Sequence, residues 1–256
     1  NDNGASLSSS ITGGRIADLA GSKTEDARRF YYPPDVALIA KRGEAAYLSL
    51  VIASGYRAHP LNTDIEDRIY LLKDKDVYNV PSSYTTLTES DLFDVTLNLV
   101  AGDSGAFGDA TADADRKTEL AAIEAANGWY IKLDDGTDSD TWLGEKGMSE
   151  ALLIEGVAVV TTYIPTPPLA STTSCLPPEG NGRVFFLDVA DGSAAFPSNL
   201  DVRTDRHKEL VRGGIPPAPN VIITKGGEPT LCIGTECEAA GFGLGARKTY
   251  WYEVEN

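Results

Sequence analysis

This sequence offers few residues that could pair as a catalytic nucleophile and its base. Ser104 lies in the tetrapeptide GDSG, a setting in which serines serve as nucleophiles of hydrolases. Such a serine needs a histidine base within hydrogen-bond reach and an acid that orients the histidine. Only two histidines occur, His59 and His207, and His59 is separated from Ser104 by an expected helical insertion. The sequence therefore predicts a flexible turn around Ser104 and no catalytic residue.

An acidic segment, DDGTDSD, is the candidate for metal binding. It carries carboxylates at Asp134, Asp135, Asp138 and Asp140, with a glycine among them. Calcium takes oxygen ligands at alternating loop positions around a sharp glycine turn. Such a loop closes with a bidentate glutamate, whereas here Glu145 follows only farther along the chain. We favour a solvated acidic turn, with calcium binding as the alternative, and we assign no metal ligand.

Two further motifs have a structural explanation that we prefer. Arg57 and His59, in the loop SGYRAHPLN, have the polar groups to bind an anion, but such loop residues more often fix turn geometry. The segment GFGLG at positions 241–245 is glycine-rich, yet no helix is expected after it, as a dinucleotide-binding loop would require. We therefore predict no cofactor-binding residue.

The chain has three cysteines. Cys232 and Cys237 bracket IGTE, a spacing that fits a disulfide across a tight turn between two strands. Metal binding by this pair would need two further ligands. Cys175 lies in a loop rich in Pro, Ser and Thr, so it is either a free thiol or paired outside this segment. This cysteine usage indicates an oxidising compartment.

Composition excludes several classes of partner. The formal net charge of −16 argues against nucleic acid and against anionic lipid, because no cationic surface is available to replace counterions. No apolar stretch approaches the roughly 20 residues that span a membrane. A hydrophobic content of 42% is enough to build a core. The chain opens on the polar stretch NDNGASLSSS without an initiator methionine, so we expect it to be part of a longer protein.

Apolar runs predict the elements that would position these residues. Three segments share one order of basic, β-branched, aromatic and large apolar residues: DRIYLLKD from Asp67, GRVFFLDV from Gly182 and RKTYWYEV from Arg247. Apolar residues on both faces mark strands that are covered on both sides. Each segment follows two apolar runs that are separated by a glycine turn. Each therefore ends a unit of strand, turn, strand, loop and strand.

These units predict an all-β fold of the β-propeller type. They span residues 33–74, 148–192 and 217–254, and a stretch from Gly128 is a candidate fourth strand that leads into the second unit. Small sheets repeated at this spacing are typical of propellers, because neighbouring blades bury each other's faces. We expect residues 1–256 to be a single domain that forms the C-terminal portion of a larger propeller, with a small ring that carries large insertions as the alternative.

An insertion at residues 77–127 is expected to contain two short helices. Thr88, three residues before Asp91, is the expected N-cap of the first. Asp113 or Asp115 is the expected cap of the second, whose apolar stripe includes Leu120 and Ile123 and which should end at Gly128.

Several blocks of the sequence resemble the C-terminal propeller domain of the PilY (also PilC) family of type IV pilus proteins. These blocks are EDARRFYYPPDVALI, SGYRAHPLN with DRIY, GEK with TTY, GRVFFLDVADG and GIPPAPNVI. The resemblance implies a modified propeller with quinoprotein-type blades, located outside the cell at the pilus tip or the bacterial outer-membrane surface. It also implies contacts with minor pilins and with a host or abiotic surface. The family's calcium-binding loop has no counterpart here, so the resemblance places calcium in a part of the protein outside this segment.

The favoured hypothesis for function is a non-enzymatic module of type IV pilus biogenesis. It would support assembly of the fimbrium, counteract retraction, and mediate adhesion and twitching motility. One alternative is a propeller enzyme, either a hydrolase or a quinoprotein dehydrogenase, although the tryptophan-docking repeat of the latter is absent. Another is a carbohydrate-binding propeller, for which Trp129 and Trp142 are too few and too irregular.

Overall fold

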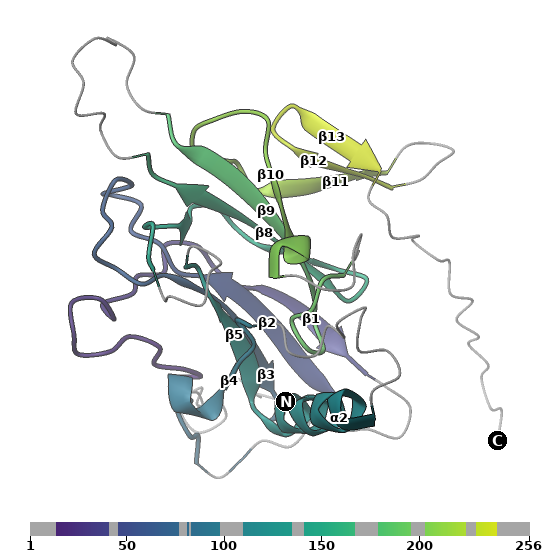
Figure 1. Cartoon of the computed structure of the whole chain (residues 1–256). Helices are drawn as coiled ribbons and strands as arrows, with labels where there is room; N and C mark the ends of the chain where they lie inside the picture. Colours follow the sequence, from purple (N-terminus) through teal and green to yellow (C-terminus); the bar gives the residue numbers. More distant parts are fainter. Residues whose placement is uncertain are drawn as a thin grey trace, which may run out of the picture.

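The computed structural model describes residues 14–40, 46–76, 81, 83–97, 110–134, 141–166, 179–195, 203–223 and 229–239. Within these ranges the protein is mostly β-structure, with three sheets and one α-helix (Figure 1). No helix in the described ranges is both long and apolar enough to cross a bilayer.

The first sheet is a meander with an added pair of strands. Its spatial order is β1-β2-β3-β5-β4, and all its pairs are antiparallel except β4 with β5. The five strands are β1 (Asp35–Ile39), β2 (Tyr47–Ala53), β3 (Arg68–Asp74), β4 (Phe93–Asp94) and β5 (Gly128–Lys132). β3 lies at the centre and is buried from Arg68 to Lys73, which explains its continuous apolar run.

The second and third sheets are also antiparallel. The second has the order β10-β9-β8-β6. Its strand β7 also pairs with β8, next to the short stretch that pairs with β6. Its strands are β6 (Lys146–Gly147), β7 (Leu152–Ile154), β8 (Val157–Ile164), β9 (Asn181–Asp188) and β10 (His207–Glu209), the last preceded by the 3-10 helix η2 (Arg203–Arg206). The third sheet has the order of its strands β11 (Pro219–Ile223), β12 (Pro229–Ile233) and β13 (Glu236–Ala239).

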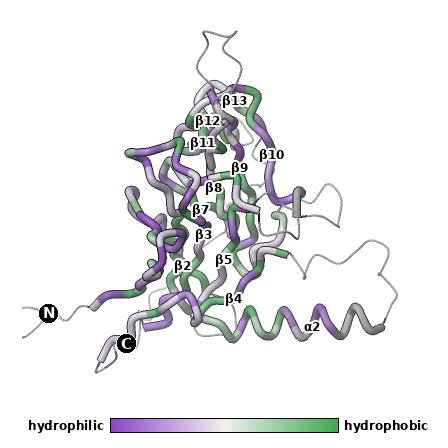
Figure 2. The backbone as a smooth tube through the Cα atoms, turned by 60° about the vertical axis from the view of Figure 1, so that its left-hand side comes forward, coloured by the Kyte–Doolittle hydropathy of each residue, from purple (hydrophilic) through white to green (hydrophobic). Residues whose placement is uncertain are grey.

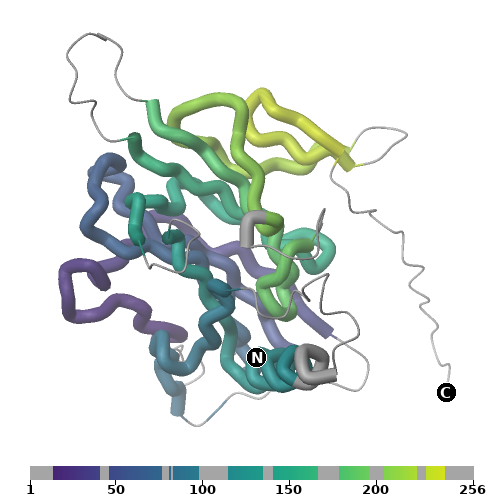
Figure 3. The backbone as a smooth tube through the Cα atoms, in the orientation of Figure 1, coloured from purple at the N-terminus to yellow at the C-terminus, as the bar shows by residue number. Residues whose placement is uncertain are grey.

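The three sheets stack in chain order, as the colours of Figure 3 show from purple through green to yellow. Val51, Leu71 and Trp129 of the first sheet pack against Val160 and Leu187 of the second in the largest apolar core. The opposite face of the second sheet, with Val157, Val159 and Val184, packs against Leu231 and Ile233 of β12. Figure 2 shows the hydrophobic stretches along these central strands. Alternating side chains on each strand thus join neighbouring sheets.

This arrangement supports a mostly β fold of stacked sheets, as the apolar runs predict. Each of the three expected units falls in its own sheet. The described sheets are open and do not close into a ring. The third unit also differs from the prediction in its last strand: β13 follows β12 directly, while the expected strand from Arg247 lies outside the described residues.

The stretch from Gly128 was expected to lead into the second unit, but it forms β5 of the first sheet. Trp129 lies opposite Leu71 of β3 in the register of this pair. Gly128 has a φ of 140° and begins the strand rather than ending the preceding helix. A Cβ at Gly128 would overlap the carbonyl oxygen of Leu71, so only glycine fits this approach.

The insertion contains one short and one long helical element. Thr88 precedes the 3-10 helix η1 (Glu89–Asp91), and its backbone N–H donates to Oδ2 of Asp91 at 2.7 Å. The helix α2 (Ala110–Ala125) begins before Asp113 and Asp115, so neither of them is its N-cap. Lys73 donates from Nζ to the carbonyl of Ile123 at 2.8 Å, and Ile123 is buried in the main core. These contacts fix the C-terminal end of α2 to the first sheet, from which the helix extends away (Figure 2).

Candidate functional site

Buried polar side chains, among them Ser54, Asp67 and Lys146, gather where the loop between β2 and β3 meets β6. The N–H of Gly147 donates to the carbonyl of Ser54 at 2.8 Å, which joins the second sheet to the end of β2. A Cβ on Gly55 would overlap the carbonyl oxygen of Gly147. This contact unites two of the sequence blocks on which the family resemblance rests, SGYRAHPLN and GEK. We call the loop 54–67 together with residues 144–148 the junction.

Lys146 organises the junction from within. Its side chain is fully buried, and Nζ donates to the carbonyl oxygens of Pro60 at 3.0 Å and Asn62 at 2.7 Å, and also to that of Gly144. An ammonium has three N–H donors, and each has a backbone acceptor here. Burial lowers the pKa of Lys146, while the nearby carboxylates of Asp67 and Glu145 act in the opposite direction. The lysine therefore fixes the path of a loop that contains no regular hydrogen-bond ladder.

Asp67 is a buried carboxyl at the base of the same loop. Ser54 donates from Oγ to Oδ1 of Asp67 at 2.7 Å, and the same Oγ accepts the N–H of Arg68 at 3.0 Å. Oδ2 of Asp67 has no hydrogen-bond partner in the described part of the chain. Burial raises the pKa of Asp67 to about 6, although its bond to Ser54 and the charges of Lys146 and Arg28 oppose the rise.

Glu145, directly before β6, is a second buried carboxyl of the junction. It is 1% exposed, and it accepts hydrogen bonds from Oγ1 of Thr162 at 2.5 Å and from Nη1 of Arg183 at 2.8 Å. Burial raises the pKa of Glu145, and the charge of Arg183 counteracts the rise. Breaking such a pair leaves an uncompensated buried charge, so its role is to hold β6 against β8 and β9.

The loop residues Arg57 and His59 lie at the surface of the junction. Arg57 donates from Nη1 to the carbonyl of Met148 at 2.7 Å. The His59 ring lies edge-on to Tyr56, with 4.7 Å between ring centroids, and the backbone N–H of His59 donates to the Tyr56 carbonyl. The Arg57 side chain therefore contacts the segment after β6, and the His59 side chain contacts its own loop.

The structure brings no histidine into a nucleophile–base pair among the residues it describes. His207 packs against Phe185 with 5.1 Å between ring centroids. Burial lowers the pKa of His207 to about 4, and the charges of Arg183 and Arg206 add to the effect. Neither His59 nor His207 hydrogen-bonds to a serine hydroxyl within the described ranges. Ser104 lies outside them, as does the glycine-rich segment 241–245.

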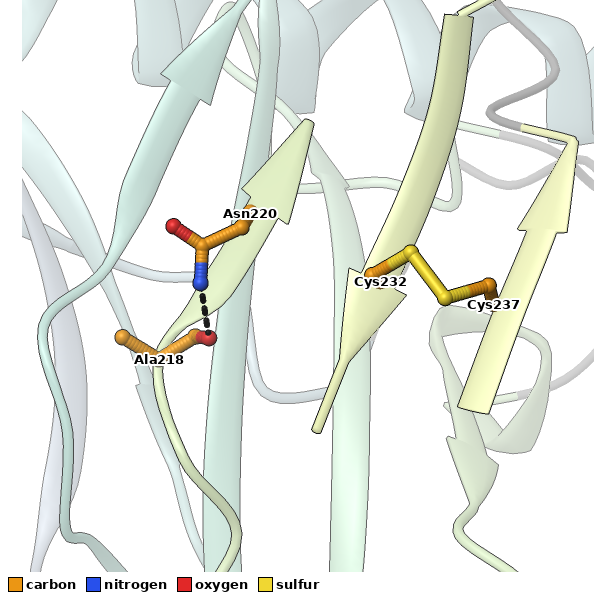
Figure 4. Close-up of a disulfide and its surroundings, with 4 residues drawn as sticks. All are labelled: Ala218, Asn220, Cys232 and Cys237. Carbon is orange, nitrogen blue, oxygen red and sulfur yellow. Dashed lines mark hydrogen bonds between the residues drawn. A yellow bond between two sulfur atoms is a disulfide. The ribbon is translucent and has the colours of Figure 1, made fainter. Parts of the chain in front are cut away.

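Cys232 and Cys237 form a disulfide between neighbouring strands of the third sheet (Figure 4). They lie directly opposite each other in the register of β12 and β13, with 4.1 Å between their Cα atoms. The turn that joins the strands contains Gly234 with a φ of 61°. Asn220 lies on the other side of Cys232 in β11 and donates from Nδ2 to the Ala218 carbonyl at 3.1 Å. Cys175 lies outside the described residues.

The acidic segment and the tryptophans contribute no assembled site within the described ranges. Asp134 is buried, while the other three aspartates of its segment lie outside those ranges. No group of three or more His, Cys, Asp or Glu side chains in the described part could hold a metal ion. Trp129 is fully buried and donates from Nε1 to the Val189 carbonyl at 3.1 Å, and Trp142 packs against the same core. Trp251 is not among the described residues.

Sequence reasoning missed the charged residues of the junction. Lys146, Glu145 and Asp67 are all buried, yet charged residues in a loop are usually exposed. The available signal was indirect: Asp67 immediately precedes a strand that is apolar on both faces, and Lys146 comes shortly before the next apolar run. Their partners are backbone carbonyls and distant side chains, which no spacing rule reveals.

Comparisons with known proteins give one informative result. The fold is similar to that of the C-terminal domain of Pseudomonas aeruginosa PilY1. The crystal structure of that domain superposes with a TM-score of 0.54 at 15% sequence identity, over 87% of this chain and 46% of that chain. This chain thus spans about half the length of the PilY1 domain. At this identity the likeness establishes the fold. No family model and no curated protein matches the sequence.

Proposed function

We propose that this chain is part of a type IV pilus protein and serves there as a non-enzymatic assembly and adhesion module. The observation that carries the proposal is the likeness in fold to the PilY1 C-terminal domain, over 87% of the chain. The proposal places the chain outside the cell, at the pilus tip or the outer-membrane surface. It gives the chain minor pilins as partners, and a host or abiotic surface as the target of adhesion.

The chemistry of the interior supports a structural rather than a catalytic role for the buried charges. All three donors of Lys146 are used by backbone carbonyls, and Glu145 is held by Thr162 and Arg183. The three donors of Lys146 are thus fully used, and each oxygen of Glu145 already accepts a hydrogen bond from the protein, as a structural role requires. Trp129 is fully buried in the core and offers no stacking surface for a sugar.

A genetic experiment tests this proposal. The gene is deleted in the source bacterium, and surface pili are counted by electron microscopy with the retraction ATPase present and absent. We expect few pili when retraction is active, recovery of pili when it is absent, and loss of twitching in both strains. Complementation with the Gly55→Ala chain should fail, whereas Gly182→Ala, a milder glycine change, should restore pili.

Normal numbers of pili and normal twitching in the deletion strain would exclude the proposed role. Recovery by the Gly55→Ala chain to the same extent as by the wild type would show that the junction does not matter for it.

A further inference from the structure

Two segments that contain no acidic residue meet at the junction. They are residues 27–34, ARRFYYPP, and residues 53–63, ASGYRAHPLNT, which together carry three arginines and one histidine. The N–H of Gly55 donates to the carbonyl of Arg29 at 2.9 Å, so the two segments lie side by side. Their composition contrasts with that of the whole chain, which has 38 acidic and 22 basic residues. We call the two segments together the arginine patch.

Two arginines of the patch stack on tyrosines of the opposite segment. The guanidinium carbon of Arg29 lies 3.8 Å from the ring centroid of Tyr56, and that of Arg57 lies 5.4 Å from the ring centroid of Tyr32. Arg29 and Arg57 are both exposed. A ring that supports a guanidinium holds it in place and leaves the N–H donors at its edge available for a carboxylate.

Neither of these guanidinium groups has a carboxylate partner in the described part of the chain. Arg29 forms no ion pair and no side-chain hydrogen bond there, and Arg57 uses Nη1 for the Met148 carbonyl at 2.7 Å. Arg28 is different, because it is buried and its Nη2 lies 2.8 Å from Oδ1 of Asp26. Arg29 and Arg57 therefore retain charged donors for a ligand.

The acidic residues that flank the two segments are engaged elsewhere. The carboxylate of Asp35 accepts two backbone N–H groups, at 2.9 and 2.6 Å. Asp64 accepts the side-chain amide of Asn62 at 2.9 Å, and Glu66 lies 3.9 Å from the guanidinium of Arg68. In the described ranges, none of these three carboxylates forms an ion pair with an exposed arginine of the patch.

The buried carboxyl of Asp67 is also close enough to interact with Arg29. Burial raises the pKa of Asp67, and among the charges that oppose the rise Lys146 and Arg28 act more strongly than Arg29. The charge of Asp67 is thus offset mainly inside the protein. Arg29 and Arg57 together form a local cationic site on an acidic chain.

We propose that the arginine patch binds a carboxylate-bearing segment of another protein, whose acidic side chain is held by Arg29 and Arg57. A guanidinium and a carboxylate match each other in a planar, bidentate geometry. Tyr31 and Leu61, on the same two segments, are 48% and 55% exposed and supply apolar contact beside the charges. Tyrosine and arginine together with apolar side chains are typical of the centres of protein interfaces. This inference stands independently of the pilus role.

The stacking geometry favours a protein segment over an acidic glycan. A sugar stacks on a free aromatic face, whereas Arg29 covers a face of the Tyr56 ring. The edge of the same ring system contacts His59, with 4.7 Å between ring centroids. The donors that face outward from the patch are therefore those of the guanidinium groups.

Peptide binding to the full chain tests the patch. The probe is a rhodamine-labelled peptide of alternating glutamate and leucine, followed by fluorescence anisotropy. Because the chain and the probe are both acidic, attraction between their net charges cannot produce binding. We expect saturable binding, and at least about tenfold weaker binding when the glutamates are replaced by glutamine.

Variants at exposed positions locate the binding. Arg29→Gln with Arg57→Gln should weaken binding of the glutamate–leucine peptide at least about tenfold. Arg29→Lys keeps the charge but loses the planar fork, so it should weaken binding at least about threefold. The matched control, Arg15→Gln with Lys23→Gln, removes the same charge from side chains that are 67% and 73% exposed and already paired with acids, and should leave the affinity unchanged. Urea unfolding of each variant verifies that it is folded.

Five outcomes would overturn the proposal. The first is absence of saturable binding to the wild-type chain, and the second is equal binding of the glutamine peptide. The third is equal loss of affinity in the double variant of the patch and in the charge-matched control. The fourth is binding of heparin, but not of the peptide, through the two arginines, because the ligand would then be an acidic glycan. The fifth is self-association in sedimentation that Arg29→Gln with Arg57→Gln removes, because the partner would then be a second copy of this chain.

Discussion

Gly55 and Gly147 approach so closely that a Cβ on Gly55 would overlap the carbonyl oxygen of Gly147. The adjacent N–H of Gly147 donates to the Ser54 carbonyl at 2.8 Å. The first two sheets are thus joined backbone to backbone at one end, in addition to the apolar core between their faces. Because neither partner in this contact is a flexible side chain, the approach cannot relax by a rotamer change.

Replacing Gly55 by alanine should therefore destabilise the protein by about 3 kcal/mol or more, since the new methyl group forces the junction apart. The control is Gly182→Ala, where the Cβ would lie 3.1 Å from Cδ1 of Leu210, an atom that can move. Urea unfolding followed by tryptophan fluorescence measures both. Equal unfolding midpoints for the two variants would show that the junction is not rigid.

The carboxyl of Asp67 should make stability depend on pH. Its pKa is raised from 3.8 to about 6 in the folded protein, so the folded state binds a proton more tightly than the unfolded state does. The contribution of Asp67 to stability is therefore full below about pH 4 and is lost as the pH rises through about 6, by about 3 kcal/mol in total.

Asp67→Asn isolates this effect. The amide oxygen can still accept the hydrogen bond of Ser54 and carries no charge, so the variant should be more stable than the wild type at neutral pH. The two should converge near about pH 4, where the wild-type carboxyl is protonated. Urea midpoints across this range test the idea. A constant difference between the two proteins at every pH would mean that Asp67 does not titrate in this window.

His207 should act in the opposite direction. Its pKa falls from 6.5 to about 4 in the folded protein, so its contribution to stability is full above about pH 6.5 and is lost as the pH falls through about 4. The loss should be about 1–2 kcal/mol after allowance for partial exposure. His207→Phe keeps an aromatic ring against Phe185 and should remove this acid sensitivity. If the variant loses as much stability in acid as the wild type, another group is responsible.

The disulfide should stabilise the third sheet specifically. Cys232→Ser with Cys237→Ser should cost about 2 kcal/mol, because the bridge restricts the unfolded chain and the loop that it closes is short. Hydrogen exchange should show the loss in β11, β12 and β13 and leave the main core unchanged. The control Cys175→Ser keeps the bridge. Faster exchange throughout the first sheet would contradict a local role.

The sequence predicts strands well where both faces are buried. β3 and β8 are covered on both sides, so their apolar runs are continuous and conspicuous. β13 is different, because Cys237, Glu238 and Ala239 are exposed and give no apolar pattern. The helix α2 was predictable from its apolar stripe, but its start was not, because it begins in an Ala/Asp-rich stretch with several possible caps.

Pairing and burial of charge were much less predictable. β5 pairs with β3 across the whole insertion, a partnership that depends on the packing of Trp129 and Leu71 rather than on sequence distance. Two of the three acceptors of Lys146 are the carbonyls of Pro60 and Asn62, far away in the chain. The two cysteines were the favourable case, because a disulfide across a turn depends only on local geometry.

Each sheet is built from one continuous stretch of chain: residues 35–132, then 146–209, then 219–239. The protein can therefore fold in the order of its synthesis, one sheet after another. Within the described ranges, every strand of a sheet comes from the same continuous stretch of chain, so no sheet needs a strand from a later stretch. Until the next sheet is made, the apolar side of the previous one is open to water. If the ribosome paused between these stretches, the apolar face of the sheet already made would stay exposed, and chaperones bind surfaces of this kind.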